Sequence, residues 1–110
     1  MDRLPPHLVN VIAQLRQGLR ELYGDRFRDL LLYGSYARGD AREGSDVDLL
    51  ILLRGPVNTS KEISRIVDLS SPLSLAPDIV LSVMPISDEA YEKGKTAFLQ
   101  TVRQEAVRAA

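Results

Sequence analysis

Apolar and polar residues alternate along the chain in patterns that predict short helices and strands. Over residues 5–23 the apolar side chains recur every three or four positions behind two prolines, which predicts a helix. Residues 27–33 (FRDLLLY) and 47–53 (VDLLILL) are short apolar runs with polar or glycine-containing borders, which is typical of strands. Beyond Asp48 the second run is apolar on both faces, so it predicts a central strand covered by helices on both sides.

The second half of the chain continues with a helix and a third strand. Thr59 or Ser60 is expected to cap a helix that ends near Ser70. Residues 78–84 (DIVLSVM) have the length and apolar character of a strand.

The last part of the chain predicts a short turn capped by Ser87 or Asp88, followed by a helix over residues 97–109. The resulting order is helix, strand, loop, strand, helix, strand, helix. It predicts an α/β fold, a small mixed β-sheet flanked by helices. A length of 110 residues with 45% hydrophobic residues suits one compact domain over residues 1–110.

Charge and cysteine content exclude several classes of protein. The net charge of -1, from 14 basic and 15 acidic residues, argues against a protein that coats nucleic acid, although it allows a brief encounter with an RNA end. The absence of cysteine excludes disulfides, cysteine-ligated zinc and thiol catalysis. Without a signal-like N-terminus or an apolar run of roughly 20 residues, the chain is expected to be cytoplasmic and to make no membrane contact.

A glycine-rich polar loop follows the first predicted strand. Residues 34–45 (GSYARGDAREGS) predict a loop with about one helical turn. Gly34 would let the backbone approach a ligand closely, and the N–H groups and the Ser35 hydroxyl could then point at phosphate oxygens. An isolated Gly-Ser pair is usually only a turn, so these two residues need support from elsewhere in the chain.

Two aspartates open the most apolar predicted strand. Asp46 and Asp48 are two positions apart, so on a strand both carboxylates project to one face, about 6.6 Å apart, and Val47 points to the other. Aspartate is a poor strand former, so this placement needs a reason. A solvated strand end is one explanation, and a cation site is the other.

A third aspartate, Asp78, begins the third predicted strand. If this strand pairs beside the second in the same direction, Asp78 lies near Asp46 and Asp48. Three carboxylates within about 4 Å would repel by around 4 kcal/mol per pair at an effective dielectric constant of 20. Oxygen-only ligands of this charge favour Mg²⁺ or Mn²⁺, and two such ions can assist a phosphoryl displacement. As a lone residue, Asp78 also fits a cap or turn after Pro77.

The stretch YGSYARGDAREGSDVDLLILL resembles the minimal nucleotidyltransferases (MNT domains) of the DNA polymerase β-like nucleotidyltransferase superfamily. Gly34, Ser35 and the two aspartates have the spacing of the GSxARG…SDxDL signature. The later DIVLS strand and the closing FLQTVRQEAV helix with Glu105 are similar to that family too. The resemblance therefore covers nearly the whole chain, and it is strongest over residues 30–53.

The resemblance implies roles for the residues of the motif. Gly34 and Ser35 match the turn that holds the nucleotide triphosphate. Asp46 and Asp48 match the aspartates that bind two Mg²⁺ ions, for which Mn²⁺ is a possible substitute, and Asp78 matches the third, catalytic carboxylate. The reaction implied is transfer of AMP from ATP to a hydroxyl, with pyrophosphate as the leaving group.

The resemblance also implies a partner. MNT proteins act beside a HEPN-family RNase toxin as the antitoxin of a hetero-oligomeric pair, and they add AMP to a tyrosine of that toxin. Two alternatives stay open: an antitoxin that neutralises its partner by binding alone, and a nucleotidyltransferase that acts on an RNA 3′ end. The near-neutral charge weighs against the latter and against stable nucleic-acid binding.

Arg38 has two possible roles, because its guanidinium could contact phosphate oxygens or could pair with Asp40 or Glu43 and brace the loop. Tyr36 could pack beside the nucleotide or on the sheet.

Three further residues receive no assigned role. Arg42 and Lys61 could approach the triphosphate, and His7, the single histidine, is expected to be neither a metal ligand nor a base.

Overall fold

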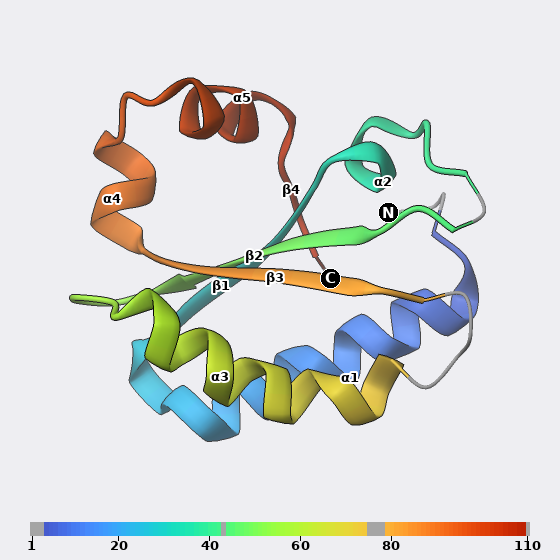
Figure 1. The fold of residues 1–110 in the computed structure, drawn as a ribbon, viewed down its shortest axis with the longest axis horizontal. Helices are drawn as coiled ribbons and strands as arrows, with labels where there is room; N and C mark the ends of the chain where they lie inside the picture. The colour runs from blue at the N-terminus through green and yellow to red at the C-terminus, as the bar shows by residue number, and fades with distance from the viewer. Residues whose placement is uncertain (1–3, 43, 75–78, 110) are drawn as a thin grey trace.

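A mixed sheet with helices on both faces forms the fold (Figure 1). The computed structural model describes residues 4–42, 44–74 and 79–109. The helical segments are α1 (Pro6–Tyr23), η1 (Gly24–Arg26), α2 (Ser35–Arg38), α3 (Thr59–Ser70), η2 (Ser71–Ser74), α4 (Asp88–Lys93) and α5 (Ala97–Glu105). The strands are β1 (Phe27–Tyr33), β2 (Val47–Leu53), β3 (Leu81–Ser87) and β4 (Val107–Arg108).

The sheet has the strand order β3-β2-β1-β4, with β2 and β3 parallel and the other pairs antiparallel. Helices α1 and α3 lie on one face, and α2, α4 and α5 lie on the other (Figure 1). The predicted class, a small mixed sheet flanked by helices, is confirmed. Across the described ranges, no helix combines the length and apolar character needed to cross a bilayer.

The core lies between the sheet and the α1–α3 pair. Leu15 and Leu19 of α1, Leu49 and Ile51 of β2 and Ile66 of α3 are fully buried. Each such side chain stabilises the fold by about 1.5–3 kcal/mol relative to an exposed one. On the opposite face the cover is lighter, and α5 contributes mainly Leu99 and Val102. The face that packs against α1 and α3 therefore provides most of the support for the sheet.

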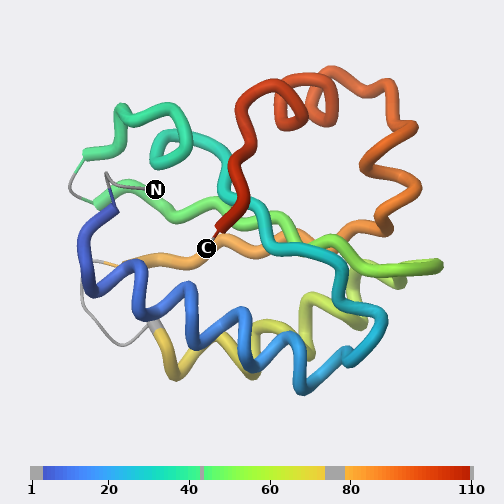
Figure 2. Tube along the Cα trace, turned by 180° about the vertical axis from the view of Figure 1, so that it is seen from behind, coloured from blue at the N-terminus to red at the C-terminus, as the bar shows by residue number. Residues whose placement is uncertain are grey.

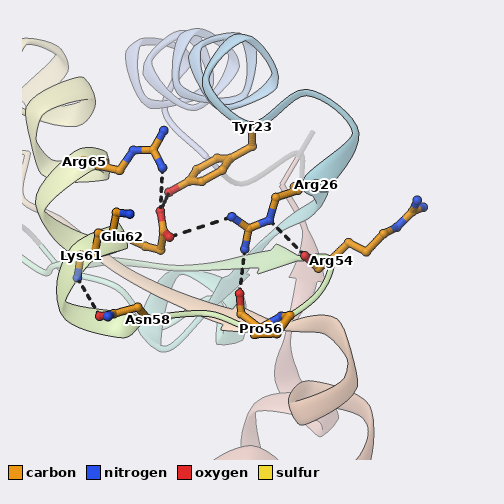
Figure 3. Close-up of polar contacts among 8 residues, drawn as sticks. All are labelled: Tyr23, Arg26, Arg54, Pro56, Asn58, Lys61, Glu62 and Arg65. Atoms are coloured by element: carbon orange, nitrogen blue, oxygen red, sulfur yellow. Dashed lines mark hydrogen bonds and ion pairs between the residues drawn. The ribbon is translucent and has the colours of Figure 1, made fainter.

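A buried carboxylate joins α1 to α3 (Figure 3). Glu62 is 4% exposed and accepts a 2.8 Å hydrogen bond from the Tyr23 hydroxyl. The guanidinium of Arg65 lies 3.3 Å from Glu62 Oε1, and that of Arg26 lies 4.0 Å from Oε2. A buried charge needs partners of this kind, and here three side chains supply them.

The third strand begins later than predicted. The prediction placed it at residues 78–84, whereas β3 runs from Leu81 to Ser87. Its bounds follow from pairing with all seven residues of β2, from Val47↔Leu81 to Leu53↔Ser87. Pro85 is tolerated because β3 is an edge strand of the described sheet. Asp78 lies outside the described residues.

The final helix is shorter than predicted, because α5 ends at Glu105 instead of continuing to residue 109. Ala106 adopts an extended conformation, and the next two residues form β4 on the edge of β1. The Ala109 N–H then donates to the Leu30 carbonyl at 2.8 Å. As a strand, these residues form backbone hydrogen bonds with the edge of β1. In a last helical turn, their carbonyl groups would have been left to hydrogen-bond with water.

Three smaller predictions can be compared with the fold. The single helical turn in the glycine-rich loop is confirmed as α2, and Ser87 caps α4 by accepting from the Ala90 N–H at 3.1 Å. The cap of α3 was wrongly predicted: the side chain of Asn58, one residue before Thr59, accepts from the Lys61 N–H at 3.2 Å. Asparagine is at least as good a cap as threonine or serine, so the helix starts where Asn58 can serve.

Candidate active site

Gly34 forms the turn between β1 and α2, and its position demands glycine. Its φ is 75°, in the region that L side chains rarely adopt. A β-carbon on Gly34 would also overlap the carboxylate of Asp48 on the neighbouring strand. The turn therefore packs directly against Asp48, the second of the paired aspartates. Ser35 begins α2 and is half-buried.

Asp46 and Asp48 lie at the start of β2, beside this turn. Asp48 is opposite Tyr33, the last residue of β1, while Val47 is buried in the core on the other face of the sheet. Asp46 is exposed and Asp48 is half-buried. Burial and the nearby negative charges of Asp46 and Glu105 raise the pKa of Asp48, and Arg38 partly offsets this. The alternation expected from the Asp-Val-Asp pattern is present, and the result is a cluster with excess negative charge.

Glu105, the last residue of α5, completes the turn from a distant part of the chain. Its Oε1 accepts from the Gly34 N–H at 3.0 Å, and its Oε2 lies 3.2 Å from Nη1 of Arg38. An acidic residue at a helix C-terminus opposes the helix dipole, so it needs other support. The predicted helix continued to residue 109, so this placement was not visible in the sequence, where only the likeness of the closing helix to the MNT family drew attention to Glu105.

Arg38 braces the loop in this structure. Besides Glu105, its Nε lies 3.3 Å from Oδ2 of Asp40. Both carboxylates raise the pKa of Arg38. Of the two partners proposed for the bracing role, Asp40 is present and Glu43 lies outside the described residues.

The remaining candidates are spread over the fold. Tyr36 packs against the core, as one of its two predicted placements requires. Arg42 lies in the loop before Asp46, where its N–H donates to Ser45 Oγ at 2.9 Å. His7 is exposed in the first turn of α1.

Lys61, which had no assigned role, lies far from the Gly34 turn. It lies in the first turn of α3, which follows the Leu53 end of β2, whereas Gly34 is at the Val47 end. The sheet therefore separates Lys61 from the turn by about the length of a seven-residue strand, about 20 Å.

The donor chemistry of this cluster fits a hard divalent cation. Asp46 and Asp48 supply carboxylate oxygens only, and the neighbouring Glu105 adds to the negative charge. Mg²⁺ and Mn²⁺ prefer such ligands. Within the described ranges no three acidic or histidine side chains are grouped tightly enough to enclose an ion, and the third predicted ligand, Asp78, is outside those ranges.

Comparison with known proteins agrees with this geometry. Residues 12–107 match the nucleotidyltransferase domain family. A Methanocaldococcus jannaschii protein provisionally named a protein adenylyltransferase is 38% identical over 96 residues, which cover 86% of this chain and 91% of that protein. The protein adenylyltransferase MntA of Thermococcus cleftensis is 33% identical over 72 residues, covering 66% and 71% of the two chains.

Solved structures share the fold at low sequence identity. A toxin–antitoxin crystal structure with AMP-PNP has a TM-score of 0.61 at 20% identity and covers 93% of this chain and 72% of its own. A nucleotidyltransferase from Sulfolobus solfataricus has a TM-score of 0.58 at 16% identity, with coverage of 91% and 77%. With a family match over most of its length and relatives named as protein adenylyltransferases, this chain belongs to the nucleotidyltransferase domain family and is an enzyme of that class.

Proposed function

We propose that this chain is a Mg²⁺-dependent protein adenylyltransferase that transfers AMP from ATP to a tyrosine hydroxyl of a HEPN-family RNase toxin, and so acts as its antitoxin. The observation that carries the proposal is the contact between the Gly34 turn and Asp48 on the adjacent strand. It puts a backbone turn suited to phosphate beside carboxylates suited to a cation.

Each residue of the motif has a task in this reaction. Gly34 and Ser35 would hold the triphosphate, and Asp46, Asp48 and Asp78 would hold the metal. When bound, Mg²⁺ supplies charge neutralisation of the phosphate oxygens. Arg38 is close enough to the turn to contact a phosphate if it leaves Asp40, although its present ion pairs favour the bracing role.

The chemical step is an in-line displacement at the α-phosphorus of ATP. The tyrosine oxygen forms a bond to the α-phosphorus, the bond to the bridging oxygen breaks, and pyrophosphate leaves with the electron pair. The hydroxyl proton passes to a carboxylate, for which Asp78 is the candidate. The chain itself stays unmodified, so catalysis rests on positioning and on electrostatic stabilisation.

The relatives support the partner assignment. One relative is named as a protein adenylyltransferase MntA, and two solved neighbours of the same fold are toxin–antitoxin complexes, one of them with AMP-PNP. The added AMP would place bulk and negative charge on the toxin, where they would oppose RNA binding.

The test is transfer of label from ATP into a protein of the host extract. The purified chain, Mg²⁺ and extract are incubated with ATP labelled at the α-phosphate or, in parallel, at the γ-phosphate. We expect one small protein to gain label from α-labelled ATP only. The Asp46→Asn/Asp48→Asn variant should lose this activity, while the matched Asp68→Asn/Glu92→Gln variant, which alters two exposed carboxylates elsewhere, should keep it.

The same experiment separates the alternatives. If no product gains label and the Asp46→Asn/Asp48→Asn variant still neutralises a co-purifying partner, the chain is an antitoxin that acts by binding alone. If the labelled product is destroyed by RNase and resists protease, the acceptor is RNA.

A further inference from the structure

A hollow rich in arginine lies at the end of the sheet opposite the Gly34 turn. It has a volume of about 450 Å³ and is formed by residues of α1, η1, β1 and β4 and by Arg54, which follows β2. Figure 2 shows η1 and the α2 loop at opposite ends of the fold. A seven-residue strand, about 20 Å long, separates Phe27 in the hollow from the turn. The hollow is therefore not part of the candidate active site.

Five of the side chains that line this hollow are arginines: Arg16, Arg20, Arg28, Arg54 and Arg108. Two aspartates, Asp25 and Asp29, are the acidic residues of its lining, so the hollow has a surplus of three positive charges. The whole chain has a net charge of -1. Positive charge is thus concentrated at one end of a slightly acidic protein, and such a concave charged surface attracts ions of opposite sign.

Several of these arginines have hydrogen-bonding capacity to spare. Arg20 and Arg54 are exposed, and neither side chain bonds to any residue that the structure describes. Figure 3 shows the Arg54 side chain extending away from the Glu62 cluster. The Nε atom of Arg16 is buried and, within the described part of the chain, has no partner. The exposed guanidinium groups of Arg20 and Arg54 are therefore available to a ligand.

The other contacts keep the hollow in shape. Arg108 lies 3.0 Å from Asp29, and Arg16 lies 3.6 Å from the same carboxyl group and also donates to the Ala109 carbonyl. Arg28 lies 3.6 Å from Asp88. Burial lowers the pKa of Arg16, as do the charges of Arg20 and Arg108, while Asp29 opposes the change. An anion in the hollow would relieve this crowding of positive charge.

We propose that this hollow is a second binding site that takes a polyphosphate group, carried by a nucleotide or by the 5′ end of an RNA. All five cations are arginines, whose planar guanidinium groups bind phosphate oxygens through two parallel hydrogen bonds. The volume falls in the range of pockets for small ligands. The Phe27 ring, 6.0 Å from the guanidinium carbon of Arg16, offers an apolar surface beside the charge.

Charge density favours polyphosphate over an acidic peptide. Side chains of an extended peptide alternate between faces, so carboxylates on one face are about 6.6 Å apart. The linked phosphates of a polyphosphate carry their charges closer together, which suits several guanidinium groups around one small hollow. Binding here would leave the transfer site free and does not depend on the reaction proposed for it.

The test is a titration with sodium tripolyphosphate in EDTA and 150 mM salt, followed by the amide and arginine side-chain NMR signals. We expect shifts at Gly24 and at the Nε–H groups of Arg20 and Arg54, with little change at Gly34. The Arg20→Gln/Arg54→Gln variant should bind about tenfold more weakly, because it loses two charge-assisted donors. The Lys93→Gln/Lys95→Gln variant removes the same charge from exposed positions elsewhere and should bind like the wild type.

Titrations with other ligands show which kind of molecule carries the phosphate group, and they also test whether the binding site exists. Tighter binding of ATP than of a 5′-triphosphorylated RNA would assign the hollow to nucleotides, and the reverse would assign it to RNA ends. The proposal is wrong if tripolyphosphate causes no shifts in the hollow, if both double variants weaken binding equally, or if hexaglutamate binds as tightly as tripolyphosphate.

Discussion

Two carboxylates, Glu62 and Asp48, are withdrawn from water in this fold, but their surroundings differ. Glu62 has the Tyr23 hydroxyl and two guanidinium groups around it. Asp48 has the negative charges of Asp46 and Glu105 beside it, which together with burial raise its pKa, against the single opposing charge of Arg38. The first carboxylate is satisfied within the chain, while the second retains an excess of negative charge that a bound cation would relieve.

This contrast separates a stabilising site from a reactive one. A buried charge that is fully paired holds elements together, and here it joins α1 to α3. Like charges held close together lower the stability of the fold, and such clusters are kept at sites where a bound ligand offsets their repulsion. Substitutions at the two places should therefore have opposite consequences for stability and for activity.

The largest effect is expected from Asp48→Asn. AMP transfer should fall by about a thousandfold or more, because a metal ligand is lost. The free energy of unfolding should stay the same or rise slightly, since the change removes one of the repelling charges. Initial rates of transfer and urea denaturation of the same preparation measure both quantities. A clear loss of stability would mean that Asp48 is a structural residue.

Glu62→Ala should do the reverse. We expect it to lower the free energy of unfolding by about 3 kcal/mol, because the Tyr23 hydroxyl loses its acceptor and the core loses a filled site. Transfer measured well below the melting temperature should be close to wild type. Glu92→Ala is the control, because that side chain is exposed, and it should leave stability within about 0.5 kcal/mol of wild type. If the folded Glu62→Ala variant transferred AMP much more slowly than wild type, the distinction between a stabilising site and a reactive one would be contradicted.

A smaller effect is expected from Glu105→Gln, which retains an acceptor for the Gly34 N–H but weakens the ion pair with Arg38. The turn should become less well positioned for the triphosphate, so we expect the KM for ATP to rise about tenfold with a smaller change in kcat. Steady-state kinetics measure the split. If neither KM nor kcat changed, Glu105 would only support the fold, whereas a fall confined to kcat would place it in the chemical step.

The last effect is confined to alkaline pH. Burial, followed by the hydrogen bond to Glu62, raises the pKa of Tyr23 from 10.0 to about 12. The neutral hydroxyl therefore contributes stability that is complete below pH 10 and is lost as the pH rises from 10 to 12. Wild type should lose about 2 kcal/mol more than Tyr23→Phe between pH 9 and 11.5 in chemical denaturation. If the free energy of unfolding changed with pH in the same way for both proteins, Tyr23 would not titrate in this range.

Local patterns in the sequence predict part of this structure well. The Gly34 turn, the paired aspartates and the buried strand β2 each depend on residues within a few positions of one another, and the fold places them as predicted. The parallel pairing of β2 with β3 was a condition of the prediction and is present. The role of Asp78 stays a prediction.

Contacts between distant residues could not be predicted from the sequence. Glu105 meets Gly34 across 71 positions, and β4 forms only because β1 leaves an edge open for it. The start of β3 was misplaced because strand bounds follow from pairing, which an apolar run alone does not specify. The arginine hollow likewise collects side chains from four separate elements and from the residue that follows β2, so no stretch of sequence shows a basic patch.

The position of Pro85 on β3 bears on how this protein behaves when it is concentrated. An uncovered strand edge can pair with the edge of another copy, which is a common first step toward aggregation. A proline in the middle of the strand removes a donor from the ladder and interrupts that pairing. Pro85 therefore opposes aggregation through the edge of β3. For the same reason, a partner protein is expected to bind through side-chain contacts and not by adding a strand to this edge.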